Sequence, residues 1–257
     1  MLDMKQIEGY YPDKIRLFKI NMLREYIQYI MLDEIYSSPY ANRLVFMGGT
    51  AIRIVLGNDR FSEDLDFDNL NLTQEEFTHL SESLRMRLIR EGLQVDVRFV
   101  FKTAYHCYIN IKSILHDYQL TGHREEKLVI RVDTEPQNFS YKPEKIILNK
   151  FDIFTRIHVV PTDTLLAQKL YAILNRSRAM GRDFFDAVFL FGRTMPNFDY
   201  LSQKTGIRTI EELKSRLIAK CQKINLEKLA KDIEPFIINP SDVKRVLLFE
   251  DFVRQLQ

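Results

Sequence analysis

Two aspartates, Asp64 and Asp66, stand one residue apart in an apolar stretch of the chain. Successive side chains of a β-strand point to opposite faces, so residues i and i+2 project together. A strand over 65–70 therefore places both carboxylates on one face, with Leu65 and Phe67 on the other. Carboxylate oxygens are the ligands that hard divalent cations such as Mg²⁺ prefer. The pair predicts a metal site at Asp64 and Asp66.

A glycine pair precedes the two aspartates, where Gly48, Gly49 and Thr50 follow the apolar stretch 43–47. Glycine lets a backbone pass close to a ligand, and a helix N-terminus offers N–H groups to an anion. We expect a strand over 43–47, a turn at the glycines, and a helix that is capped by Thr50 and ends near Gly57. This order favours a nucleoside triphosphate held between the turn and a metal. The alternative is an ordinary turn beside a solvated strand.

A third carboxylate would complete a site for two metal ions, which clamp the attacking and leaving oxygens of a phosphoryl displacement. Asp133 follows the alternating stretch 128–132 and is the first candidate. Asp96, on the alternating stretch 95–101, is the competing candidate. Each of the two can equally be an ordinary polar residue of a strand.

The bulk composition is that of an ordinary globular protein. The chain has 257 residues, 46% hydrophobic and 28% charged, with a formal net charge of +2. This charge gives no global attraction to nucleic acid, so any basic patch must be local. Cys107 and Cys221 form no CxxC pair, and no apolar run approaches the ~18 residues of a membrane span. We expect a soluble, cytoplasmic protein with reduced thiols and no membrane partner.

Hydrophobic periodicity predicts a fold that changes character along the chain. Strand-like alternation over 95–101, 107–112 and 128–132 indicates an antiparallel-looking sheet, whereas 136–161 contains three prolines and few clear periods. We therefore expect a boundary near residue 160, between an α/β (α+β) domain over 1–160 and a helical domain over 161–257. The expected helices cover residues 13–37, 73–90, from 162 onwards, 182–191, 209–232 and 240–256.

Two longer motifs resemble a known family. Residues 46–53 (FMGGTAIR) and 60–67 (RFSEDLDF) resemble the first signature of the AbiEii/AbiGii family, whose members are nucleotidyltransferase-like toxins of the DNA polymerase beta-type superfamily. Residues 166–172 (LAQKLYA) and 182–186 (RDFFD) resemble its K…R…RDxxD helical motif. The resemblance covers roughly residues 40–192. It implies a mixed-sheet nucleotidyltransferase core and a C-terminal helical domain that completes the active-site cleft.

The resemblance also implies roles for residues outside the metal pair. Lys169 is expected to contact the triphosphate, while Asp183 and Asp186 are expected active-site acids. The expected nucleotide-binding residues are Gly48, Gly49, Thr50, Arg53, Ser62, Lys169, Arg176 and Arg182. Gly49 stands where relatives often carry a phosphate-binding serine, so a backbone N–H or Thr50 must take that role. Without the resemblance, Arg182 and Asp186 would be read as an exposed i,i+4 ion pair worth ~0.2–0.5 kcal/mol.

These expectations describe one reaction. An acceptor hydroxyl attacks the α-phosphate of an NTP. The expected ligands of Mg²⁺ (or Mn²⁺) are Asp64, Asp66 and Asp133. The proton of the hydroxyl is expected to pass to Asp133, Asp183 or Asp186. The resemblance implies an RNA acceptor such as tRNA, a role as the toxin of a toxin–antitoxin or abortive-infection system, and a cognate antitoxin as partner. The alternatives are a small-molecule acceptor, a non-catalytic nucleotide-binding regulatory protein, and an ordinary α/β protein with accidental motifs.

Overall fold

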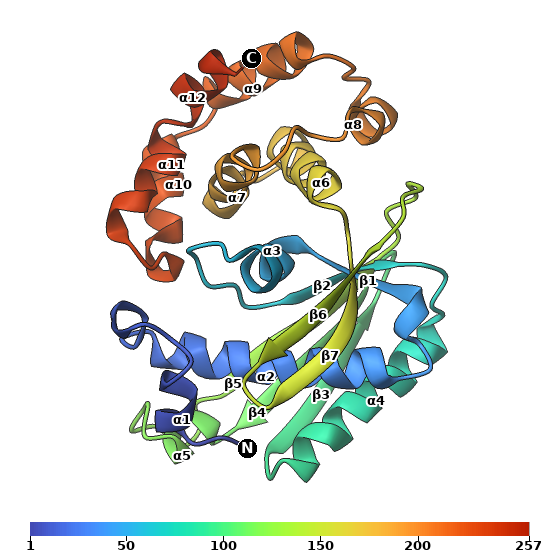
Figure 1. Ribbon diagram of the computed structural model, residues 1–257, viewed down its shortest axis with the longest axis vertical. Helices are drawn as coiled ribbons and strands as arrows, with labels where there is room; N and C mark the ends of the chain where they lie inside the picture. The colour runs from blue at the N-terminus through green and yellow to red at the C-terminus, as the bar shows by residue number, and fades with distance from the viewer. Residues whose placement is uncertain (257) are drawn as a thin grey trace. The chain divides into compact units, whose positions relative to one another are not determined.

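The mixed sheet expected from the sequence is present, in the first of two compact units of the chain (Figure 1). The computed structural model describes residues 1–256. The first unit comprises residues 1–55 and 61–160, and the second comprises residues 56–60 and 161–257. The short segment 56–60 groups with the C-terminal helices because its side chains bond there. The expected domain division had placed it in the first domain.

Seven strands form the sheet in the order β3-β4-β5-β2-β1-β7-β6. Strand β2 pairs in parallel with β5 and β1 pairs in parallel with β7, whereas the other neighbours are antiparallel. The sheet is therefore mixed, and only its β3–β4–β5 part matches the expected antiparallel pattern. The strands are β1 (Leu44–Met47), β2 (Leu65–Asn69), β3 (Gln94–Phe101), β4 (Tyr105–Lys112), β5 (Leu128–Glu135), β6 (Glu144–Lys150) and β7 (Ile153–Val159).

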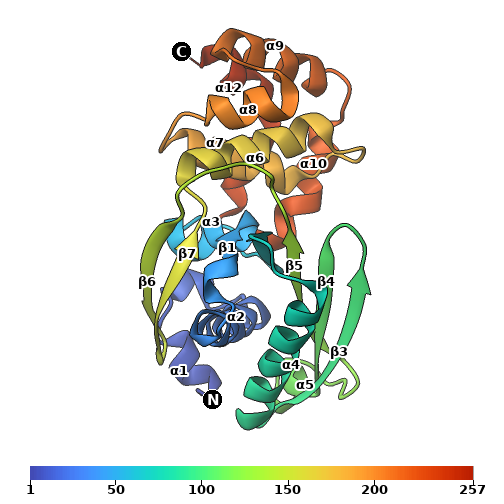
Figure 2. The same cartoon turned by 90° about the vertical axis from the view of Figure 1, so that its right-hand side faces the viewer.

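Strands β6 and β7 form a hairpin inside the stretch that we expected to be a boundary region. Its prolines lie outside the two strands, so they do not interrupt the ladder. Leu148, Ile157 and Val159 are buried, and they alternate with exposed or half-buried neighbours along each strand. Helix α2 (Lys19–Ser37) lies between this hairpin and the β3–β5 part of the sheet (Figure 2). Sequence periodicity did not indicate these two seven-residue strands, whereas the division between the two units lies at residues 160 and 161, next to the expected boundary.

The helices of the first unit cover the core of the sheet. Helix α4 (Gln74–Arg90) begins at the expected residue, since Thr73 and Glu76 form a capping box. The long N-terminal helix starts later than expected, at Lys19, because residues 13–15 form a separate 3₁₀ turn after Pro12. The other elements are α1 (Met4–Glu8), η1 (Asp13–Ile15), η2 (Ala41–Arg43), α3 (Gly48–Leu56) and α5 (Ile114–Asp117).

The second unit is helical, as expected. Helices α6 (Thr162–Asn175) and α7 (Gly181–Phe191) pack together. Gly181 opens α7 where the backbone carbonyl of Leu229 occupies the space that a Cβ would need. The remaining elements are α8 (Phe198–Thr205), α9 (Ile210–Cys221), α10 (Leu226–Ile233), η3 (Glu234–Phe236), η4 (Pro240–Val243), α11 (Lys244–Leu247) and α12 (Phe249–Gln255).

Two of the expected long helices in this unit are divided. The stretch 209–232 breaks because the Asn225 side chain accepts a hydrogen bond from the Lys228 N–H and starts a new helix. The stretch 240–256 consists of a 3₁₀ turn followed by two short helices, and α8 was not expected at all. Within residues 1–256, no helix has the length and apolar character that crossing a membrane requires.

Candidate active site

The glycine turn between β1 and α3 lies against the carboxylate of Asp66, a residue of β2. In the antiparallel pair of β1 and β2, Met47 lies opposite Asp66. Gly48, the next residue after Met47, therefore lies close to Asp66. Gly48 has a φ of 78°, and a Cβ at this position would collide with the Asp66 carboxylate. Only glycine accepts both the positive φ and this close approach. The turn therefore places Asp66 beside the N-terminal N–H groups of α3.

Thr50 lies inside α3 rather than before it. The helix starts at Gly48, so the expectation that Thr50 caps it was wrong. The buried Thr50 hydroxyl donates instead to the backbone carbonyl of Asp64. On the other side of this loop, the buried Gln28 amide donates to the carbonyls of Ser62 and Glu63 over 3.1 Å and 3.0 Å. These contacts hold the backbone that carries the aspartate pair.

Asp133 is the carboxylate that the sheet brings next to the pair. Strands β2 and β5 run parallel with Asp66 aligned to Asp133. The competing candidate, Asp96, lies on β3, which is separated from β2 by β4 and β5. Asp96 is exposed and pairs with Lys112 at 2.5 Å. Position in the sheet therefore favours Asp133 over Asp96 as the third carboxylate.

An arginine and a histidine hold this carboxylate group. The Arg131 guanidinium bridges Asp64 and Asp133, with Nη2 lying 2.8 Å from Asp64 Oδ2 and Nε 2.7 Å from Asp133 Oδ2. His106 Nδ1 lies 2.8 Å from Asp133 Oδ1. Burial raises the pKa of Asp133 above its usual value, although His106 and Arg131 oppose the shift. Asp133 is therefore a better proton acceptor than an ordinary exposed aspartate.

The donor chemistry of Asp64, Asp66 and Asp133 fits a hard divalent cation, since all three offer carboxylate oxygens, Asp66 and Asp133 from neighbouring strands and Asp64 from the residue just before β2. Within residues 1–256, however, no group of three or more histidine, cysteine, aspartate or glutamate side chains is arranged to hold a metal ion. Asp64 and Asp133 face the Arg131 guanidinium instead. The three carboxylates therefore match a hard cation in donor chemistry alone, and the Arg131 guanidinium contacts two of them.

Arg53 lies in a buried ionic cluster. Its Nε is 2.8 Å from Glu25 Oε2, and its guanidinium carbon lies 4.6 Å from the centre of the Phe61 ring. Glu25 also receives Lys150 Nζ at 2.7 Å and the Tyr11 hydroxyl at 2.8 Å. Burial raises the pKa of Glu25, but Arg53 and Lys150 outweigh it and lower that pKa overall. In this arrangement Arg53 ties α3 to α2.

A second cluster, within the second unit, is centred on the fully buried Asp186. Arg60 binds both of its oxygens, with Nε 2.7 Å from Oδ1 and Nη2 2.6 Å from Oδ2. Lys169 Nζ lies 2.9 Å from Asp186 Oδ2, and the Asn58 amide donates to Oδ1 over 2.8 Å. Burial raises the pKa of Asp186, yet Arg60 and Lys169 lower it below the usual value.

The other residues of the RDxxD motif extend the second cluster. Asp183 receives Lys169 Nζ at 3.2 Å and Arg176 Nη1 at 2.9 Å. Asp183 is also buried, whereas Arg182 is half-buried. The surface Arg182–Asp186 pair is not formed, because Asp186 is buried among Arg60, Lys169 and Asn58. Lys169 is thus held between two carboxylates.

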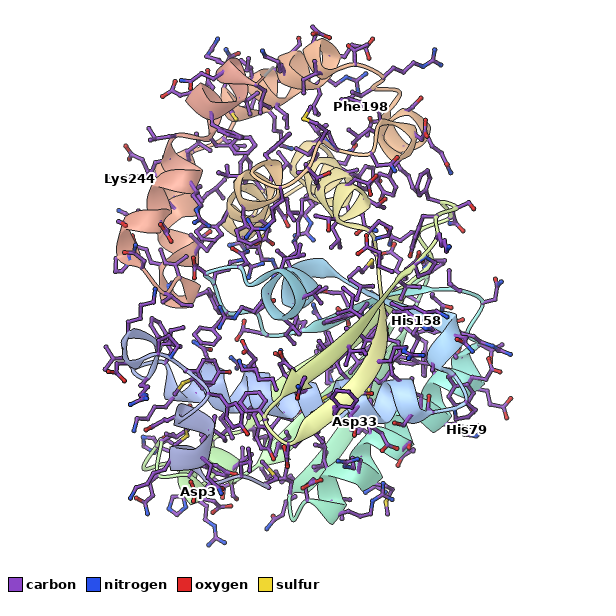
Figure 3. All side chains as sticks on the ribbon, viewed as in Figure 1. Asp3, Asp33, His79, His158, Phe198 and Lys244 are labelled. Carbon is purple, nitrogen blue, oxygen red and sulfur yellow. The ribbon has the colours of Figure 1, made fainter. Side chains whose placement is uncertain are left out.

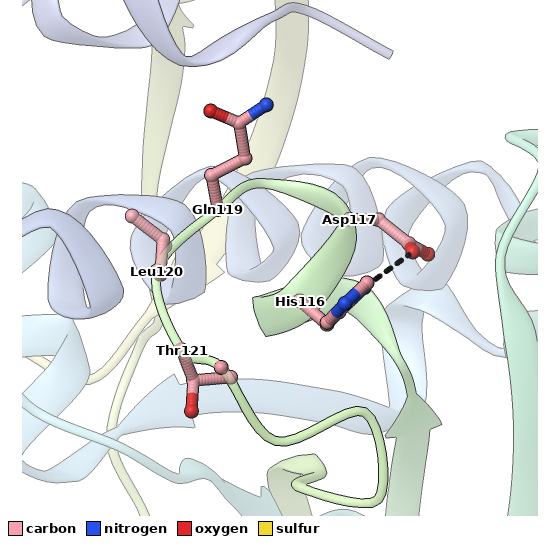
Figure 4. Close-up of a pocket in the computed structure, with 6 residues that line it drawn as sticks. His116, Asp117, Gln119, Leu120 and Thr121 are labelled. Atoms are coloured by element: carbon pink, nitrogen blue, oxygen red, sulfur yellow. Dashed lines mark ion pairs between the residues drawn. The ribbon is translucent and has the colours of Figure 1, made fainter.

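A pocket elsewhere in the first unit lies beside the short helix α5 (Figure 4). His116 and Asp117 line it and pair at 3.6 Å. Residues 119–122 complete its wall. The pocket includes none of the residues that the sequence motifs single out.

Several site residues were missed by sequence reasoning. Arg131 could have been predicted from the sequence, because it lies two residues before Asp133 in an alternating strand and must share a face with Asp133. His106 follows only from the register of β4 with β5, which places it opposite Asp133. Arg60 and Asn58 reach Asp186 across 126 and 128 residues of sequence, so no local pattern indicates that contact.

Comparison with known proteins identifies a family whose model matches this chain. The family model described as "Nucleotidyl transferase AbiEii toxin, Type IV TA system" matches residues 30–250 of the chain. The match spans both the glycine turn with its aspartates and the Lys169 cluster. No curated protein matches significantly.

Two solved structures from Helicobacter pylori share the fold. One is JHP933, with 16% sequence identity and a TM-score of 0.55 over 91% of this chain and 90% of that chain. The other is a putative nucleotidyltransferase, with 17% identity and a TM-score of 0.55 over 92% of this chain and 97% of that one. At these identities the likeness concerns the fold alone.

Proposed function

The chain belongs to the AbiEii family of nucleotidyl transferase toxins of type IV toxin–antitoxin systems, and we propose that it transfers a nucleoside monophosphate from an NTP to an acceptor hydroxyl. The observation that carries this proposal is the convergence of Asp66, the Gly48 turn and Asp133 at neighbouring strand positions. A cognate antitoxin is the partner that this family implies.

We assign the binding of the nucleotide to the turn and the strands of the first unit. The N–H groups at the start of α3 point their positive dipole end at the triphosphate. Asp64, Asp66 and Asp133 are the residues that would hold Mg²⁺ or Mn²⁺. When bound, such an ion supplies charge neutralisation at the phosphates and at the leaving pyrophosphate. Within the second unit, Asp183 and Asp186 orient Lys169, which we propose as a phosphate-binding cation.

Proton transfer is assigned to Asp133. His106 Nδ1 lies 2.8 Å from Asp133 Oδ1 and fixes the orientation of this carboxylate. In the proposed step, the acceptor hydroxyl loses its proton to Asp133 as its oxygen attacks the α-phosphate, and the bond to pyrophosphate breaks. A displacement of this kind requires the acceptor oxygen, the phosphorus and the leaving oxygen to be roughly in line.

An RNA acceptor is supported by the outward face of the β6–β7 hairpin. Alternation and strand register put six side chains on this face: Lys145, Ile147, Asn149, Phe154, Arg156 and His158. Phe154 is 72% exposed and Ile147 is 52% exposed. Burial and the positive charges of Lys145 and Arg156 lower the pKa of His158, which is labelled in Figure 3. Exposed cations beside an exposed aromatic ring suit a phosphate backbone and a stacked base.

The first test is transfer of label from each α-³²P-labelled NTP to total cellular RNA, with Mg²⁺ or with EDTA. Asp66→Asn is expected to lose at least 100-fold of the activity, as removal of a group that stabilises transition-state charge commonly does. Asp96→Asn is the matched control, since this exposed aspartate lies on the same sheet away from β2. It is expected to retain full activity.

Equal labelling by wild type and Asp66→Asn would refute the assignment of Asp66. Labelling that survives EDTA would refute metal dependence. NTP binding without transfer to RNA would instead favour a small-molecule acceptor or a non-catalytic regulatory role.

A further inference from the structure

We propose that Arg131 is an internal counter-cation that occupies the metal site, so that its guanidinium and a divalent ion exclude each other at Asp64 and Asp133. This inference rests on the proposed function, because it takes the three aspartates as the metal-binding group. It assigns to Arg131 a role in positioning those aspartates and in controlling when the site can be loaded.

The geometry of the guanidinium carries the inference. Arg131 reaches Asp64 from β5 with a hydrogen bond of 2.8 Å across 67 residues of sequence. The same side chain lies 2.7 Å from Asp133 Oδ2, and Asp133 is in register with Asp66. One cation therefore touches two carboxylates of the group and lies close to the third. A metal bound by the same oxygens would face a fixed positive charge at ion-pair distance.

The two contacts of Arg131 differ in quality. The contact with Asp64 is a hydrogen bond, whereas Nε is buried and makes no aligned hydrogen bond within residues 1–256. The Nε–Asp133 contact is thus mainly a charge attraction. The Arg131 side chain is about one third exposed, so solvent reaches part of it. These features describe a contact that a competing cation can displace.

The electrostatics point in the same direction. The Arg131 guanidinium lies within ion-pair distance of Asp64 and Asp133. Its positive charge lowers the repulsion among three neighbouring carboxylates, which is the effect that a divalent ion would have if it were bound there.

The experiment measures binding of Mn²⁺ alone to the nucleotide-free protein, with free Mn²⁺ followed by electron paramagnetic resonance. Arg131→Gln is expected to bind Mn²⁺ about tenfold more tightly than wild type, the effect of removing one charge about 6 Å from a divalent ion in a water-like dielectric. A residue that merely supports the fold would not increase affinity when it is removed. Arg43→Gln is the matched control, because Arg43 also pairs with a carboxylate in the first unit, at Glu76.

A second variant covers the case in which Arg131→Gln fails to fold in EDTA. Arg131→Lys keeps the charge, but a single ammonium lacks the fork that bridges two carboxylates. Its affinity for Mn²⁺ is expected to lie between those of wild type and Arg131→Gln. Unchanged or weaker Mn²⁺ binding in the folded Arg131 variants would overturn the proposal.

Two further measurements separate this inference from the proposed function. Metal-dependent nucleotidyl transfer by wild type, together with unchanged Mn²⁺ affinity in Arg131→Gln, would overturn the role of Arg131 and leave the function standing. Absence of transfer, together with tighter Mn²⁺ binding that Asp64→Asn abolishes, would support the role of Arg131 and overturn the function.

Discussion

Glu25 shows how a single buried charge is stabilised in this protein. Its carboxylate is fully buried and faces Arg53, Lys150 and the Tyr11 hydroxyl. Its lowered pKa means that the two cations outweigh the cost of removing the charge from water. The cluster joins α3, which starts at the glycine turn, to α2. Its stability therefore affects the position of the candidate nucleotide-binding turn.

Glu25→Gln is expected to lower the free energy of unfolding by about 3–5 kcal/mol, because it leaves two partly buried cations, Arg53 and Lys150, without this counter-charge. Urea unfolding followed by circular dichroism would measure the change. Glu63→Gln is the matched control, since Glu63 is 42% exposed and pairs with Arg24 at 3.2 Å. Loss of the Glu63–Arg24 ion pair is expected to lower the free energy of unfolding by about 1 kcal/mol or less. Equal effects of the two substitutions would contradict the buried-charge argument.

Asp186 gives a pH dependence with a defined sign. Its pKa in the folded protein lies below the ordinary value of 3.8, despite the opposing effect of burial. The stabilisation by Arg60 and Lys169 is therefore fully present above pH 3.8 and is lost as the pH falls through the folded pKa. Thermal unfolding between pH 7 and pH 3 is expected to show a smaller acid-induced loss in Asp186→Asn than in wild type. Parallel curves for the two proteins would exclude this assignment.

At the scale of elements, the β6–β7 hairpin is the main structural addition that the sequence did not indicate. It supplies β7, the parallel neighbour of β1, and so supports the strand that ends at the glycine turn. Its inner face carries the buried Leu148, Ile157 and Val159, and its outer face carries Phe154 and the cations Lys145 and Arg156. One face of the hairpin thus packs in the core, and in our proposal the other face binds the RNA acceptor.

The double variant Phe154→Ala, Arg156→Gln is expected to weaken RNA binding at least tenfold, because stacking on one base contributes about 1–3 kcal/mol and each phosphate contact adds to it. Fluorescence anisotropy with a labelled single-stranded RNA would measure the affinity at two salt concentrations. The matched control is Leu17→Ala, Lys102→Gln, which removes an exposed apolar side chain and a cation elsewhere on the first unit. A salt slope that stays at the wild-type value in the Phe154, Arg156 variant would argue against an RNA-binding face.

At the scale of the whole molecule, the chain crosses between its two units more than once. The segment 56–60 leaves the first unit after α3 and returns before β2. Arg60 on this segment pairs with Ile237 in an isolated bridge and binds Asp186 through two nitrogens. The stability of the C-terminal helices therefore depends on residues from the first quarter of the sequence.

Arg60→Met is expected to destabilise the second unit by about 3–5 kcal/mol, because it leaves the buried Asp186 with fewer counter-charges. Native-state hydrogen exchange should show loss of protection in α6 and α7 with little change in β3, β4 and β5. Arg208→Met, at an exposed position of the same unit, is the control. Equal loss of protection in the sheet and in the helices would contradict this assignment.

The sequence by itself determined the features that depend on neighbouring residues. Periodicity located α4 and the strands β3, β4 and β5, and the i,i+2 spacing predicted that Asp64 and Asp66 share one face. Two motifs in the correct order indicated the family. Local spacing carries this information because the periods of a helix and of a strand are properties of the backbone.

The tertiary structure decided which distant residues meet. It aligned Asp133 rather than Asp96 with Asp66, placed Arg131 between two aspartates, and brought Arg60 to Asp186. These contacts depend on strand order, on register and on the path of the segment 56–60, which are set by burial of the whole core. Register matters because a shift of one residue would turn every side chain of a strand to the opposite face.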